Sequence, residues 1–237
     1  MKYKITKNTV QETLVIPLYG RKMCSERYPA LYRDETAIRL IDQIDYDFAA
    51  LEKKSDGLMQ RFGVLEAAMR QTDLAFEVRD YLKTHPNAAV VNLGCGLDDT
   101  AWFSRIDTSG GAVFFAAGVF YYFLKEQVRA LVQQMAEAFP GGVLVFDAAN
   151  EKAVRLMLKT WIKDAAIQDV GAYFAVADAR RELSAWDSRL HVSSRGYMLG
   201  YNDLKDPSVS GFFRFLSRIG DNRMNMQIVK IGFGARR

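Results

Sequence analysis

The chain has 237 residues, of which 49% are hydrophobic and 25% charged, and its formal net charge is +4. This composition is that of a folded globular protein, and so mild a charge without basic clusters excludes an extended nucleic-acid surface. The longest apolar run, 112–124, is shorter than the roughly 20 residues that span a membrane, so we expect no membrane association.

Cysteine and histidine are too rare for a metal centre. Cys24 and Cys95 have no metal-binding spacing, and His85 and His191 are the only histidines, so we expect no metal. Two unpaired thiols and the lack of an apolar signal-peptide core near the first residue are typical of a cytoplasmic protein, which we predict.

The first 85 residues predict a helical N-terminal cover after an extended start. Two runs of apolar residues, in 58–69 and 74–82, repeat at helical spacing, and His85-Pro86-Asn87 ends the second run. An earlier helix is predicted to be capped by Asp34, with an apolar face made of Ala37, Ile38, Ile41 and Ile44.

Strands and helices alternate after residue 86. Three apolar runs predict strands: Ala88–Leu93, Ala112–Ala117 and Val143–Phe146. One helix is predicted between the second and third strands, from Leu124 to Met135, and another follows the third, capped by Asn150. Two later strands, Leu190–Ser194 and Met224–Phe233, are expected to be partly antiparallel. This alternation predicts an α/β fold for 86–237, with a largely parallel sheet covered by helices on both faces.

The first of these strands ends in Gly94-Cys95-Gly96. Glycine lacks a Cβ atom, so this turn lets a nucleotide-like ligand approach the backbone at the carboxyl edge of the sheet. Such a site also needs an acidic residue at the end of the next strand, about 20 residues on, to bind the ribose. Ala116-Ala117-Gly118 supplies none, so the sequence holds the glycine half of a cofactor site without the ribose half.

Several segments resemble the leucine carboxyl methyltransferase family, above all its branch of tetracenomycin-type polyketide O-methyltransferases. They are VVNLGCGLD, AVFFAAGVFYYF, AFPGGVLVFDAAN and the N-terminal stretches TLVIPLYGRKMCSERYP, RDETAIRLIDQIDYDF and RFGVLEAAMRQTDLAFEVRDYL. The resemblance implies the class I methyltransferase fold, which is Rossmann-like. It also implies S-adenosylmethionine as the cofactor and methyl transfer to a carboxylate or hydroxyl of a small, polyketide-like molecule.

The resemblance also implies roles for single residues. Arg70 would pair with the cofactor's carboxylate, the alternative being a solvated helix arginine. Asp147 is expected to cap the next helix rather than to orient a substrate. No catalytic residue is predicted, because a carboxylate acceptor is already ionised and needs no base. The other cofactor-binding residues are expected at the strand ends: Asn92, Gly94, Cys95, Gly96, Ala117 and Gly118. Tyr19, Arg21, Tyr46 and Tyr122 are expected to line the substrate site.

The chain departs from this family before its second strand. The family has a strand–helix–strand segment there that carries the ribose anchor, whereas only 15 residues, Leu97–Gly111, fill the interval here. A strand–helix–strand unit takes roughly 30 residues. We therefore expect a sheet shortened on one side, and weaker cofactor binding unless Asp98 or Asp99 replaces the anchor. The new sheet edge should favour a homodimer unless Trp102, Phe103 and Ile106 cover it.

Two further classes of protein compete with an active methyltransferase. A cofactor-binding or scaffold protein that has lost catalysis fits the missing ribose anchor. A hydrolase is disfavoured because no GxSxG surrounds any serine, and a dehydrogenase because position 99 is Asp instead of the third glycine of GxGxxG.

Overall fold

The computed structural model describes residues 2–7, 9–54, 57–94, 106–163, 171–202, 204 and 206–234. The N-terminal elements are β1 (Tyr3–Lys4), α1 (Val10–Thr13), α2 (Val15–Arg27), α3 (Glu35–Gln43), β2 (Ile44–Asp45), α4 (Ala49–Lys54) and the long helix α5 (Leu58–Thr84). The elements that follow are β3 (Ala89–Asn92), β4 (Ala112–Ala116), the 3-10 turn η2 (Phe120–Tyr122), α6 (Lys125–Ala138), β5 (Val143–Ala148), α7 (Glu151–Met157), its π-helical continuation η3 (Leu158–Lys163), α8 (Ala179–Ser184), β6 (Leu190–Gly196), α9 (Gly211–Arg223) and β7 (Gln227–Phe233).

The predicted helix starts are confirmed by their hydrogen bonds. Asp34 Oδ1 accepts from the N–H of Ala37 at 2.8 Å, and Asn150 Oδ1 accepts from the N–H of Ala153 at 3.1 Å. The two apolar runs before residue 85 form one helix, α5, because neither proline nor glycine separates them. The predicted face of the Asp34-capped helix was one residue too long: Ile44 lies in β2 and pairs with Tyr3.

The five strands of the main sheet have the order β3-β4-β5-β7-β6. β3, β4 and β5 are parallel, whereas β7 is antiparallel to both of its neighbours. The predicted mixed α/β sheet is therefore confirmed, including the antiparallel character of its last strands. Within the described residues no strand lies beyond β3, so the predicted shortening on that side is confirmed as well.

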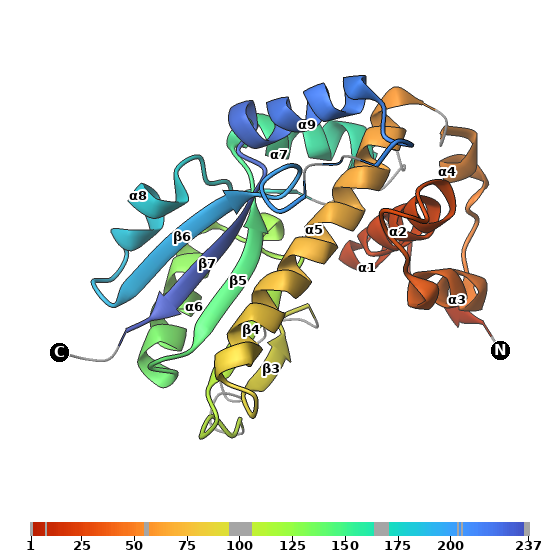
Figure 1. Cartoon of the computed structure of the whole chain (residues 1–237). Helices are drawn as coiled ribbons and strands as arrows, with labels where there is room; N and C mark the ends of the chain where they lie inside the picture. Colours follow the sequence, from red (N-terminus) through yellow and green to blue (C-terminus); the bar gives the residue numbers. More distant parts are fainter. Residues whose placement is uncertain are drawn as a thin grey trace.

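Helices cover both faces of this sheet (Figure 1). Successive strand residues point to opposite faces. On β4, Val113 packs in the core that includes Leu65 and Met69 of α5, whereas Phe114 packs in the core that includes Val132 of α6. Cys24 of α2 belongs to the same core as α5, so the N-terminal helices and the sheet share buried contacts.

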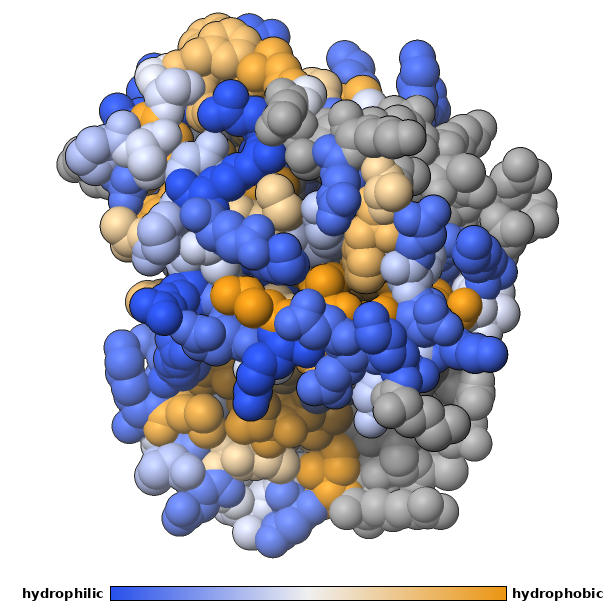
Figure 2. Space-filling view, turned by 90° about the vertical axis from the view of Figure 1, so that its right-hand side faces the viewer, coloured by the Kyte–Doolittle hydropathy of each residue, from blue (hydrophilic) through white to orange (hydrophobic). Residues whose placement is uncertain are grey.

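The N-terminal helices α1–α4 lie to one side of α5, and α7 and α9 lie near the carboxyl ends of the parallel strands (Figure 1). Figure 2 shows the side that carries α1–α4, where hydrophobic side chains gather in a hollow below a band of hydrophilic ones. None of the described helices is both long enough and apolar enough to cross a membrane.

Candidate functional site

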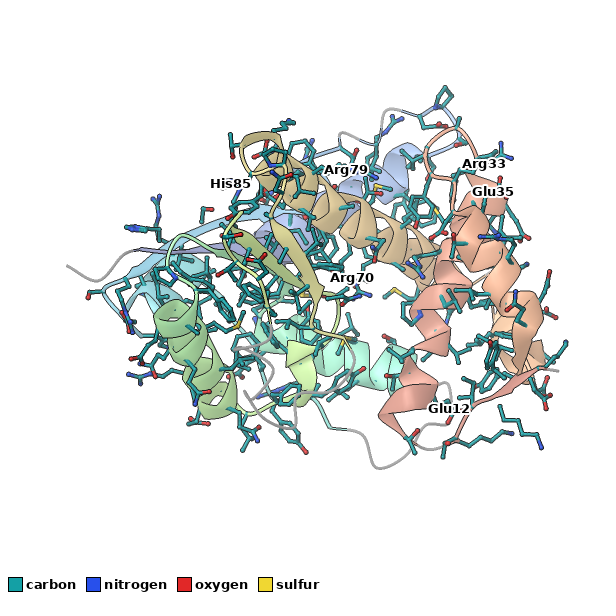
Figure 3. The ribbon with its side chains drawn as sticks, turned by 90° about the horizontal axis from the view of Figure 1, so that it is seen from below. Glu12, Arg33, Glu35, Arg70, Arg79 and His85 are labelled. Atoms are coloured by element: carbon teal, nitrogen blue, oxygen red, sulfur yellow. The ribbon has the colours of Figure 1, made fainter. Side chains whose placement is uncertain are left out.

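A cavity of about 130 Å³ lies where β4 ends, between the sheet, α5 and the N-terminal helices. Arg70 reaches from α5 into the space between the sheet and these helices (Figure 3). The cavity lies at the carboxyl edge of the parallel strands, which is where sheets of this kind bind ligands. The other residues on its wall that matter below are Thr13, Tyr19, Glu66, Ala117, Gly118, Tyr121 and Tyr122.

Arg70 is held in place by Asp147, at the end of β5. Arg70 Nη1 lies 3.2 Å from Asp147 Oδ2, and the side chains are 15% and 1% exposed. Burial acts to lower the pKa of Arg70, but Asp147 and the other acidic groups nearby outweigh it and raise that pKa. Arg70 is therefore a permanent cation beside the cavity, and the alternative of a solvated helix arginine is wrong.

Asp147 also connects this arginine to the turn after β4. Its Oδ1 accepts from the backbone N–H of Gly118 at 2.6 Å. The prediction that Asp147 caps the helix that follows it is therefore wrong, because Asn150 holds that position. This arrangement was not predicted from the sequence, because residues 70, 118 and 147 come together only through tertiary packing.

The backbone conformation of residue 118 favours glycine. Its φ is +68°, a conformation in which a Cβ atom is strained. A Cβ atom built there would also lie 3.4 Å from Arg70 Nη1 and 3.6 Å from Arg70 Cζ. Gly118 thus leaves the space beside the guanidinium open for a ligand.

Glu66 lies one helical turn before Arg70 on α5 and lines the same cavity. The Tyr197 hydroxyl donates to Glu66 Oε1 at 3.1 Å. Burial raises the pKa of Glu66; Arg70 and the Tyr197 hydrogen bond act against this rise, and Asp147 adds to it. Burial is also the main cause that raises the pKa values of Tyr121 and Tyr197 well above the ordinary one, so both hydroxyls stay protonated.

A second cavity of about 260 Å³ adjoins the first and lies between α5, α7 and α9. Glu66, Tyr121 and Met157 line both cavities, so they form a shared wall. The site therefore has two compartments with a carboxylate between them.

Five of the predicted site residues come together at the first cavity: Arg70, Ala117, Gly118, Tyr19 and Tyr122. Tyr122 also donates from its hydroxyl to Thr13 Oγ1 at 3.1 Å. Asn92 and Gly94 are exposed at the end of β3, and Cys95 and Gly96 lie outside the described residues.

Arg21 and Tyr46 are not among the described residues that line this cavity. Arg21 Nη1 lies 3.6 Å from Asp34 Oδ2, at the junction of α2 and α3. The Tyr46 hydroxyl donates to Glu12 Oε1 at 2.8 Å. Both side chains bind other parts of the N-terminal segment.

Glu66 and Tyr197 were not predicted as site residues. One signal for Glu66 was available: it is a charged residue within the apolar stretch 63–69, four positions before Arg70 and so on the same helix face. Tyr197 gave no comparable signal. The part of the chain that the structure describes contains no group of three His, Cys, Asp or Glu side chains that could hold a metal ion.

No protein-family model matches this chain. Over 93 residues, 39% of its length, it is 30% identical to the tetracenomycin polyketide synthesis O-methyltransferase TcmP of Streptomyces glaucescens. The match spans only 32% of the length of that relative.

A solved structure shows a likeness of fold. A DUF574 family protein from Streptomyces avermitilis has a TM-score of 0.51 at 9% identity, covering 82% of this chain and 92% of its own. A methyltransferase candidate from Thermobifida fusca YX covers 97% of this chain and 96% of its own at 14% identity, with a TM-score of only 0.47. The chain thus shares its fold with the DUF574 family protein, and 93 of its residues are similar in sequence to the tetracenomycin polyketide synthesis O-methyltransferase TcmP.

Proposed function

We propose that this chain is an S-adenosylmethionine-dependent methyltransferase that transfers a methyl group to an oxygen atom of a small molecule. The observation that carries the proposal is the Arg70 guanidinium, a largely buried cation on a cavity at the carboxyl edge of the sheet. Asp147 engages one of its five N–H donors, so other donors remain for a ligand. Guanidinium pairs best with a carboxylate, such as that of an amino-acid moiety.

The residues around the first cavity fit the amino-acid end of this cofactor. Arg70 would bind the α-carboxylate, Asp147 would keep Arg70 in position, and Gly118 would leave the space beside it free. When bound, the cofactor would supply an electrophilic methyl group on its sulfonium. The adenosine end would lie toward the turn after β3, where Gly94, Cys95 and Gly96 are the predicted contacts.

Methyl transfer of this kind depends mainly on alignment of the acceptor oxygen with the methyl group. The N-terminal helices would contribute through Tyr19 of α2, which stacks on Phe48 at a ring distance of 5.4 Å and lines the cavity. Tyr122, fixed by Thr13 of α1, would line the same space. A polyketide-like acceptor is proposed only from the partial similarity to TcmP.

A second candidate function is that of a cofactor-binding scaffold without catalysis. It is favoured by β3, which is the edge strand of the described sheet and lies where the family's ribose-binding segment would begin. The enzyme and the scaffold differ in methyl transfer, although both bind the cofactor.

Calorimetric titration with S-adenosylmethionine and S-adenosylhomocysteine tests the proposal. We expect saturable binding of both, weaker than is usual for an intact ribose site, because a lost charge-assisted hydrogen bond costs about 1.5–3 kcal/mol. Incubation with methyl-labelled cofactor and a set of hydroxylated and carboxylated aromatic compounds then separates enzyme from scaffold. No binding of either ligand at millimolar concentration would refute both functions.

A further inference from the structure

The second cavity is large and apolar enough to hold a ring-containing ligand. Its volume is about 260 Å³, whereas an apolar cavity of about 150 Å³ already admits one benzene ring. Met59 of α5 and Leu156 of α7 are each 38% exposed, so the wall reaches the surface between these helices and offers an entrance. Its apolar wall is made chiefly of Met59, Phe62, Leu156, Leu216, Ile219 and Met224.

Glu66 is the one charged group among the described residues that line this cavity. Its Oε1 accepts from Tyr197, which is itself 1% exposed and therefore fixes the carboxylate. Among the described residues, Oε2 of Glu66 has no hydrogen-bond partner. A partly buried carboxylate oxygen in apolar surroundings is stabilised by a donor, and a ligand hydroxyl in this cavity would supply one.

The charges around Glu66 discriminate between types of ligand. Arg70 is the only cation among the described residues that line either cavity; it lines the first cavity alone, where its free donors are proposed to bind the carboxylate of the cofactor. A ligand that brings a carboxylate into the second cavity would lose its hydration and face Glu66 without a compensating cation. An uncharged ligand with a hydroxyl group avoids this cost.

We propose that the second cavity binds the methyl acceptor, and that the acceptor is an uncharged, largely apolar ring compound whose hydroxyl donates to Oε2 of Glu66. This inference rests on the proposed methyltransferase function and selects hydroxyl over carboxylate as its target. Because Glu66 lines both cavities, a hydroxyl bound to it would lie at their boundary, next to the first cavity, where the methyl donor is proposed to lie.

Glu66 then acts as the base of the transfer. It takes the hydroxyl proton while the acceptor oxygen bonds to the methyl carbon, and the carbon–sulfur bond breaks with its electron pair left on sulfur. Burial raises the pKa of Glu66, so it is a stronger base than an exposed carboxylate. The hydrogen bond from Tyr197 keeps Oε1 occupied and leaves Oε2 for the acceptor.

A pair of matched probes tests the pocket and the role of Glu66. The full chain, with and without S-adenosylhomocysteine, is titrated calorimetrically with 2-naphthol and with 2-naphthoate. We expect 2-naphthol to bind at least about tenfold more tightly than 2-naphthoate, a difference of about 1.4 kcal/mol. Glu66→Gln removes the negative charge at nearly unchanged size, so this preference should fall to roughly threefold or less.

A filled cavity provides the second arm of the test. Leu216→Trp, in the cavity wall, should weaken both probes, whereas Phe215→Trp, exposed on the same helix, should leave both unchanged. Thermal unfolding followed by circular dichroism checks that the variants fold. If Leu216→Trp does not fold, Ile219→Phe on the same wall replaces it in the test.

Equal binding of the two probes to the unmodified chain, or binding that survives the filled cavity, would overturn the proposal. So would a Glu66→Gln variant that binds S-adenosylhomocysteine more weakly but keeps its preference for naphthol, since Glu66 would then bind the cofactor's ammonium. If S-adenosylhomocysteine does not bind at all, the proposed function fails. In that case, a preference for 2-naphthol that depends on Glu66 in the cofactor-free protein would still support the second cavity as a binding site for a hydroxylated ring. The absence of this preference would overturn that assignment.

Discussion

Asp147 accepts a hydrogen bond from Arg70 at 3.2 Å and another from the backbone N–H of Gly118 at 2.6 Å. One carboxylate therefore joins α5, the turn after β4 and the end of β5 at the floor of the candidate site. Because the Asp147 side chain is 1% exposed, removing either member of its pair with Arg70 leaves a charge in surroundings that do not solvate it.

Asp147→Asn should lower the free energy of unfolding by about 3–5 kcal/mol, because it leaves Arg70 buried without its counter-ion. Urea unfolding followed by circular dichroism measures the loss. Glu151→Gln is the control: it breaks the pair with Arg155 on the surface of α7, where the side chains of Arg155 and Glu151 are 79% and 75% exposed, and should cost less than about 1 kcal/mol. If Asp147→Asn lowered the free energy of unfolding by no more than Glu151→Gln does, the buried pair would not support the site.

Gly118→Ala should lower stability by roughly 1–2 kcal/mol, the cost of a side chain in the left-handed conformation. It should also weaken S-adenosylhomocysteine binding, because its Cβ atom would occupy the space beside Arg70. Gly141→Ala is a matched control, since Gly141 has a φ of +84° and a Cβ atom there meets nothing within 4 Å. If both variants affect binding alike, the space beside Arg70 is not where the ligand lies.

The apolar periodicity of the sequence was sufficient to predict the main strands and the two helical runs that join in α5, because burial alone decides which strand and helix residues face the core. It was insufficient for the contact of Glu66 with Tyr197, 131 positions apart, which depends on how α5 crosses the sheet. Tyr19 and Arg21 show a further limit. Residues two positions apart are rotated by about 200° about the helix axis, so Tyr19 and Arg21 face nearly opposite sides of α2. Of these two residues, only Tyr19 lines the cavity.

The stability of the protein should depend on the protonation of Asp73, a buried residue of α5. Its Oδ1 accepts from Asn202 Nδ2 at 2.9 Å, while Oδ2 has no hydrogen-bond partner among the described residues. Burial raises the pKa of Asp73 from 3.8 to about 8. Between these values the folded chain holds a proton that the unfolded chain has lost, so this residue makes stability fall as pH rises.

The slope of this decrease reaches at most about 1.4 kcal/mol per pH unit for one proton. Urea unfolding between pH 5 and pH 8 measures it. Asp73→Asn cannot titrate, so its stability relative to the unmodified chain should improve steadily across this range. Parallel pH profiles for the two proteins would contradict the assignment.

The edge of the sheet gives a prediction about assembly. β3 is the edge strand of the described sheet, and its Val90 is 48% exposed. Because an open edge strand pairs readily with another chain, we propose a homodimer that uses this edge. Light scattering should show that the dimer dissociates on dilution. Val90→Lys should shift the equilibrium toward the monomer, whereas Leu124→Lys, at another exposed site, should not. A monomer at every concentration would refute the dimer.

Arg70 is proposed to anchor the carboxylate of a methionine-derived cofactor. This role is tested most directly by calorimetry with S-adenosylhomocysteine and with 5′-methylthioadenosine, which lacks the amino-acid end. Arg70→Lys keeps the charge but not the two-pronged donor geometry, and Arg79→Ala, exposed on the same helix, serves as its control. We predict that Arg70→Lys weakens S-adenosylhomocysteine about tenfold or more, leaves 5′-methylthioadenosine unchanged, and that Arg79→Ala alters neither. Equal effects of Arg70→Lys on both ligands, or no effect on S-adenosylhomocysteine, would contradict the account.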